Sequence, residues 1–142
     1  MKNRLLTPEE VLVLNSLYRI PPAHAHYFEL WTSVTNGHAH SIQTFTFPVN
    51  GNSTDGHAHT FAGITSLAEG HHHHFEGVTG PAIPLEDGSH YHEIDWKTYD
   101  KPFTHKGNAH IPLQNDRHFH IIKVRTTTGL GYEPRFYYLN RR

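Results

Sequence analysis

The chain has 142 residues, a formal net charge of −1 with neutral histidines, and an apolar fraction of 36%. This length suits one domain with a modest core, and the near-zero charge offers no basic surface for nucleic acid or for a membrane. The absence of cysteine excludes disulfides and thiolate metal sites, whereas the 16 histidines favour pH sensitivity or metal binding.

Residues 1–22 predict a short helical segment. Thr7 can cap the helix, Pro8 suits its first position, Glu10 completes a capping box, and Pro21-Pro22 ends it. We interpret this helix as a plug at one end of a β-domain, with a docking or oligomerisation helix as the alternative. The segment lacks the uninterrupted apolar run of a signal peptide. It therefore predicts synthesis in the cytoplasm and leaves assembly outside the cell, in a spore layer or in a virion open.

From residue 23 onward, glycine, proline, asparagine and threonine interrupt short runs of β-branched and aromatic residues, which predicts an all-β domain over residues 23–128. Residues 129–142 predict a tail strand. The domain contains six His-x-His pairs, and the first five begin at spacings of 14, 19, 14 and 19 residues. A 33-residue unit with one short and one long half therefore repeats, as short antiparallel hairpins or as a solenoid-like stack. The pairs are His24/His26, His38/His40, His57/His59, His71/His73, His90/His92 and His118/His120.

Each pair is followed by an apolar residue and then a threonine, four and eight residues after its first histidine. The apolar residues are Phe28, Ile42, Phe61, Phe75, Ile94 and Ile122, and the threonines are Thr32, Thr46, Thr65, Thr79, Thr98 and Thr126. Since alternate side chains of a strand share a face, both histidines and the apolar residue point the same way. His105 marks a decayed copy of the pair, and His110 is either its displaced partner or a surface residue.

Two imidazoles on one face of a strand, about 7 Å apart, can converge on one cation. Four of them suit tetrahedral zinc, and six, supplied by three strands around an axis, suit octahedral iron or nickel. All twelve paired histidines are therefore candidate ligands. The alternative is a ladder of neutral imidazoles that bond one another and the threonines without metal. The imidazole nitrogen that does not bind metal needs a hydrogen-bond acceptor. The candidate acceptors are Glu29, Asp55, Glu69, Glu93 and Asp116, and the alternative for each is an ordinary carboxylate exposed to solvent.

Two further features of the sequence carry expectations. Gly63 and Gly77 occupy matching places in the repeat and predict a bulge or a close approach between strands. The run from His71 to His74 keeps two members in repeat register, and we expect the other two, His72 and His74, to face solvent.

The stretch HHHHFEGVTGPAIPLEDGSHYHEI, from His71 to Ile94, resembles the YmaF-like family of small bacterial His-rich repeat proteins, which repeat H-x-H, G-x-T and T-G-x-x-I-P. The resemblance covers roughly residues 23–128 and implies no particular activity. The G-H-x-H motifs that begin at Gly37 and Gly56 are also similar to bacteriophage tail-fibre segments, in which three intertwined chains bind ions along the fibre axis.

The first functional hypothesis is a structural protein that self-associates through its His-x-His metal sites into a fibre, filament or coat layer. The second is a soluble metal buffer or sensor. A metalloenzyme ranks last, because no pair has a distinct open position or a dedicated base. The sequence therefore predicts a homo-oligomeric, non-enzymatic protein that binds zinc, iron or nickel and has no nucleic-acid or membrane partner.

Overall fold

The computed structural model describes residue 5 and residues 7–10 and 23–130. Residues 8–10 form helix, and the Glu10 amide donates to Thr7 Oγ1 at 3.1 Å, so the predicted helix start is confirmed. The rest of the predicted helix and the tail from residue 131 lie outside the described residues. Within the part that is described, no helix is long and apolar enough to cross a membrane.

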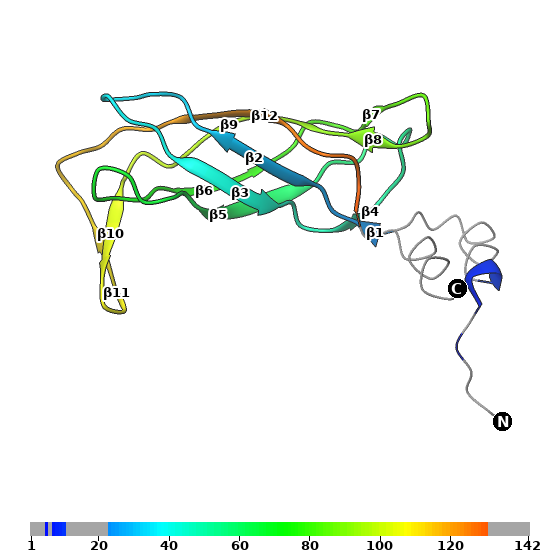
Figure 1. Cartoon of the computed structure of the whole chain (residues 1–142), viewed down its shortest axis with the longest axis horizontal. Coiled ribbons are helices and arrows are strands. Elements are labelled where there is room, and N and C mark those ends of the chain that lie inside the picture. The colour runs from blue at the N-terminus through cyan, green and yellow to red at the C-terminus, as the bar shows by residue number, and fades with distance from the viewer. Residues whose placement is uncertain (1–4, 6, 11–22, 131–142) are drawn as a thin grey trace.

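Three antiparallel two-stranded ribbons form the body of the molecule (Figure 1). Ribbon A pairs β2 (Tyr27–Trp31) with β3 (Ser41–Phe45), and ribbon B pairs β5 (Thr60–Ile64) with β6 (His74–Val78). Ribbon C pairs β9 (Glu93–Lys97) with β12 (Ile121–Arg125). The all-β class and its hairpins are confirmed, and the repeats gather around a common axis rather than stacking in a line.

Shorter strand pairs occupy the two ends of the elongated body. At one end, β1 (Ala23–His24) pairs with β4 (Val49–Asn50), and β7 (Ile83–Pro84) pairs with β8 (His90–Tyr91). At the other end, β10 (Phe103–Lys106) and β11 (Ala109–Pro112) form a projecting hairpin (Figure 1).

The ribbons are joined to one another near their ends. The residue after each buried threonine donates its amide to the carbonyl of the first strand residue in the next ribbon, at 2.8 to 3.1 Å. The six bonds run from Ser33 to Ile121, Phe47 to Thr60, Ser66 to Ser41, Gly80 to Glu93, Tyr99 to His74 and Thr127 to Tyr27. The described strands pair only two by two, so the three ribbons stay separate two-stranded sheets rather than forming a closed barrel.

The core is a single apolar layer halfway along the axis. The six apolar residues at the predicted repeat position are 0 to 3% exposed, and the six threonines are 2 to 5% exposed. Each threonine Oγ1 accepts a hydrogen bond, at 3.0 to 3.1 Å, from the amide of the second histidine on the partner strand of its ribbon. The threonine side chains thus continue the hydrogen bonding of each ribbon past the ends of its strands, and they hold the backbone of the second histidine in place.

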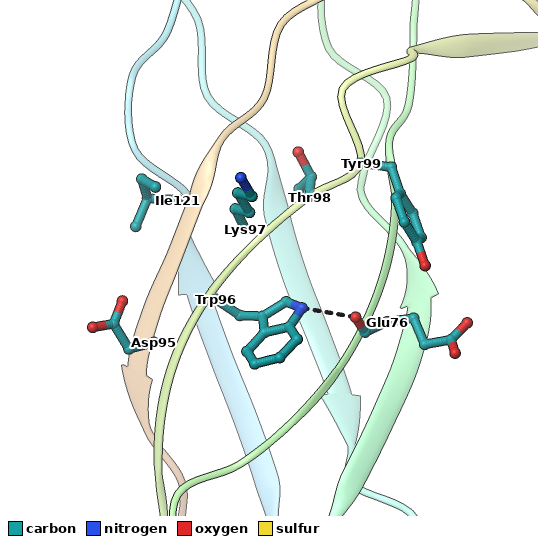
Figure 2. Close-up of a pocket in the computed structure, with 7 residues that line it drawn as sticks. All are labelled: Glu76, Asp95, Trp96, Lys97, Thr98, Tyr99 and Ile121. Carbon is teal, nitrogen blue, oxygen red and sulfur yellow. Dashed lines mark hydrogen bonds between the residues drawn. The ribbon is translucent and has the colours of Figure 1, made fainter.

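Trp96 bridges ribbons B and C (Figure 2). Its indole Nε1 donates to the Glu76 carbonyl at 2.7 Å, in a groove of about 400 Å³ that Tyr99 and Ile121 also line. A Cβ on Gly77 would lie 2.6 Å from the Trp96 ring, so the predicted close approach at this glycine is confirmed.

The β10–β11 hairpin is an insertion into the repeat. A strict 33-residue period would place the third copy of His71/His73 at positions 104 and 106 (71 + 33 and 73 + 33). The hairpin occupies that stretch, and the pair follows it as His118/His120, 28 residues after His90 instead of 14. His105 is therefore not a decayed copy, because its backbone pairs with His110 within the hairpin.

Two six-histidine clusters

The twelve paired histidines converge on two points, one at each end of the ribbons. Cluster 1 consists of His24, His26, His57, His59, His90 and His92, whose ligand nitrogens all lie within 4.8 Å of one another. The same limit holds for His38, His40, His71, His73 and His120 at the other end. His118 completes cluster 2, because its Nε2 lies 3.1 Å from His73 Nε2 and 3.2 Å from His38 Nε2.

This arrangement follows from the antiparallel ribbons. In each ribbon one strand follows its His-x-His pair at one end, and the partner strand follows its own pair at the opposite end. Three ribbons around an axis therefore place three pairs at each end, with the apolar layer between them. The expectation of six imidazoles from three strands is met twice, and within a single chain.

The second histidine of each pair, which we call inner, is oriented by the backbone of a neighbouring ribbon. Its Nδ1–H donates to the carbonyl of the residue after a buried threonine, at 2.8 to 3.0 Å in all six cases. The pairs are His26 with Thr127, His40 with Ser66, His59 with Phe47, His73 with Tyr99, His92 with Gly80 and His120 with Ser33. A proton on Nδ1 leaves the Nε2 lone pair to face the centre of the cluster.

The first histidine of each pair, which we call outer, lies nearer the tip. In cluster 2, His38, His71 and His118 each donate from Nδ1 to the carbonyl two residues earlier, at 3.4, 3.2 and 2.9 Å. In cluster 1, His57 Nδ1 donates instead to the carboxylate of Asp55, at 2.6 Å. These bonds also turn Nε2 inward, so both rings of a pair present the same atom.

The inward nitrogens are closely spaced and in part unpartnered. Between Nε2 atoms the shorter separations are 3.0 to 3.2 Å in both clusters. The Nε2 atoms of His40, His92 and His120 are buried without any hydrogen-bond partner among the described residues. Converging lone pairs of this kind repel one another, and each unpaired buried acceptor costs about 1–3 kcal/mol. A cation at the centre would satisfy all of them.

Protonation of these nitrogens would be the alternative to a bound cation, but burial in the cluster opposes it. Burial, reinforced by the neighbouring imidazoles, lowers the pKa of His26 and His73 to about 3 and that of His40 and His59 to about 4. The hydrogen bond from each ring to a backbone carbonyl raises the pKa but does not offset this effect. The pKa values of His92 and His120 are lowered for the same reason. At neutral pH the six inner rings are therefore uncharged nitrogen donors, the form in which imidazole binds metal.

The remaining histidines lie outside both clusters. His72 and His74 are half-buried rather than solvent-facing, because the inserted hairpin covers them. His74 stacks on Phe103 with ring centroids 4.2 Å apart, and Phe103 stacks on the exposed ring of His110 at 4.3 Å. The sequence alternation alone could not reveal this covering layer.

The candidate acceptors divide into three groups. Asp55 accepts from an outer histidine through its carboxylate, and Glu69 and Asp116 do so through backbone carbonyls. Glu29 instead accepts from the Tyr27 hydroxyl, and the Glu93 carbonyl accepts from the Gly80 amide. The six carbonyls that orient the inner rings were not predicted, since a carbonyl has no side-chain signature; only their constant place after the repeated threonine could have indicated them.

Comparison with known proteins bears on the family. No curated protein and no solved structure matches the chain. The family model described as "YmaF: Spore germination protein GerY/YamF" matches residues 55–140, which is 86 of the 142 residues and includes four of the six His-x-His pairs. This confirms the resemblance over that range, and the chain belongs to the YmaF family.

Proposed function

We propose that this protein is a structural metal-binding protein that holds two transition-metal ions, one in each six-histidine cluster. The observation that carries the proposal is the set of inward Nε2 atoms, three of which are buried and have no hydrogen-bond partner in the described part of the chain. The hydrogen bonds at Nδ1 support the same conclusion, because they fix the rings as ligands before any ion arrives.

The spacing favours octahedral coordination. Adjacent ligands of an octahedron are separated by √2 times the bond length, so separations of 3.0 to 3.2 Å correspond to metal–nitrogen bonds of about 2.1–2.3 Å. A tetrahedral zinc site with bonds of about 2.05 Å would need separations of about 3.3 Å and only four ligands. Six neutral nitrogen donors therefore favour iron or nickel over zinc.

A structural role fits better than a catalytic one. Six protein ligands leave no open position for substrate or water, whereas catalytic sites keep one. The apolar core is a single layer of six residues, so an ion at each end would contribute much of the folding free energy. In this proposal the metal fastens the three ribbons at both ends of this thin apolar layer.

The family name supports a setting in the bacterial spore. Self-association, expected from the sequence, stays part of the proposal, but both clusters are completed within one chain and need no ligand from a neighbour. Exposed apolar side chains would supply the contacts instead. Trp31 and Val34 are each 73% exposed, and Phe45 and Phe47 are about half exposed.

A metal buffer or sensor is the second candidate, because the same clusters would serve it. The half-buried outer residue His38 gives solvent a route to cluster 2, whereas the His57 side chain in cluster 1 is only 8% exposed. A buffer would release its ions within seconds to a chelator, whereas a structural protein would release them only as it unfolds. The rate of metal loss distinguishes the two.

The test is the metal content of untagged full-length protein, measured by plasma mass spectrometry after purification without added metal or chelator. We expect two ions per chain, and one after either His59→Ala or His73→Ala, which alter cluster 1 and cluster 2 respectively. His105→Ala is the matched control, because this exposed histidine lies outside both clusters. A folded protein that contains no metal and takes up none of Fe²⁺, Ni²⁺ or Zn²⁺ would overturn the proposal.

A further inference from the structure

The two clusters differ in what holds their outer rings. All three outer histidines of cluster 2 donate to neutral backbone carbonyls. The nearest carboxylate contact there is longer, since Asp116 Oδ1 lies 3.6 Å from His118 Nδ1. In cluster 1 the His57 ring donates to an ionised carboxylate at 2.6 Å.

The loop before His57 is built to hold that carboxylate in place. Asp55 Oδ1 also accepts from the His57 amide at 3.1 Å, and Oδ2 accepts from the Asn52 amide at 3.0 Å. The Asn52 side chain in turn accepts from the Thr54 amide at 3.0 Å. An aspartate is ionised at neutral pH, and this carboxylate accepts hydrogen bonds from the His57 ring and from the amides of Asn52 and His57. The group is therefore a fixed negative charge at neutral pH.

A glycine completes the arrangement on the other side of the ring. A Cβ on Gly51 would lie 2.5 Å from both Cγ and Nδ1 of His57, so any larger residue would displace the imidazole. Gly51 and Asp55 thus confine the same ring, one by its shape and the other by its charge.

We propose that the two metal sites are unequal and that Asp55 makes cluster 1 the tighter one. This inference rests on the proposed function. A carboxylate that accepts from Nδ1 raises the basicity of the ligand nitrogen and adds a negative charge beside the ion. Carbonyl acceptors supply the orientation without the charge. The ion at the β1/β4 end is therefore bound first and lost last, and Asp55 acts as a positioning residue for it.

The test follows metal loss from each end separately. Full-length protein labelled with ¹⁵N is loaded with two Co²⁺ ions, and a chelator is added until one ion per chain remains. Because Co²⁺ is paramagnetic, it shifts the amide signals near whichever cluster still holds it. We expect the shifts to persist at Thr54 and Asp55 and to disappear at Asn36 and Gly37.

Asp55→Asn is the decisive variant, because asparagine keeps a hydrogen-bond acceptor and removes the charge. Its cluster 1 should bind Co²⁺ about 10–100-fold more weakly, so that the two ends release together or in reverse order. Gly51→Ala should weaken the same site by crowding His57. Asp116→Asn is the matched control, and we expect less than about a threefold change at cluster 2, because a carbonyl holds that ring.

The outcomes separate this inference from the function on which it rests. Equal release from both ends of the wild-type protein, or no change with Asp55→Asn, would overturn the inequality and leave metal binding intact. If the folded protein bound no Co²⁺ at all, at one end or the other, the proposed function itself would be overturned.

Discussion

We predict that the hydroxyl groups of the buried threonines stabilise the fold, and the variant Thr65→Val tests this. Thr65 is 2% exposed, and its hydroxyl accepts from the His73 amide at 3.0 Å and donates to the Ser66 carbonyl at 3.1 Å. Valine has nearly the same shape but neither bond, so it leaves a buried amide without an acceptor. Such a group costs about 1–3 kcal/mol, and we expect the free energy of unfolding to fall by that amount.

The assay is urea denaturation of the metal-loaded protein at a fixed metal concentration, followed by tryptophan fluorescence. Thr60→Val is the matched control, since it makes the same chemical change at an exposed position of the same ribbon, and we expect an effect within about 0.5 kcal/mol. Thr65→Ser keeps the hydroxyl and should lose about 1 kcal/mol or less, for one buried methyl group. A Thr65→Val protein as stable as Thr60→Val would refute the role given to the hydroxyl.

Three further changes test the core, the ribbon contact and the response to acid. Phe61→Ala empties a fully buried site in the apolar layer and should cost about 3–5 kcal/mol of unfolding free energy in urea titration; a loss below about 1 kcal/mol would contradict a packed layer. Gly77→Ala places a Cβ 2.6 Å from Trp96 and should cost about 1–3 kcal/mol, whereas Gly80→Ala, with its nearest neighbour at 3.4 Å, should cost less. Acid should destabilise the protein, because the folded chain keeps His26 neutral down to about pH 3 while the unfolded chain binds protons below about pH 6.5. Stability is then complete above pH 6.5 and falls as the pH drops below it, and a Tm that does not change between pH 7.5 and 5 would exclude this linkage.

The sequence predicts well which side chains of each strand point toward the axis of the fold. Alternation along a strand places His24, His26 and Phe28 on one face, and repetition of that pattern places six such sets in one domain. This prediction depends only on residues close together in one strand, where the backbone fixes the direction in which each side chain points. That is why the core residues and the twelve histidines that gather in the two clusters could be named in advance.

The arrangement of strands around the axis depends on contacts that the sequence does not encode by residue type. The choice between four and six ligands was left open, because it depends on how many ribbons meet at each end. The carbonyl of Ser66 that orients His40 belongs to another ribbon and would look the same in any residue. The hairpin after Asp100 shifts His118 out of register, so the pair His118/His120 was named correctly while its place in the repeat was wrongly assigned to His105.

The inserted hairpin shows that the chain can be interrupted at the tip of a ribbon without loss of the cluster there. Fourteen extra residues separate β9 from β12, yet His118 and His120 still reach their places. In ribbons A and B the matching tips are tight turns, Thr35 to His38 and Ala68 to His71, with positive φ at both central residues. Peptides grafted at these tips would be displayed beside one another at the same end of the molecule, which makes the fold a small scaffold for presenting up to three loops.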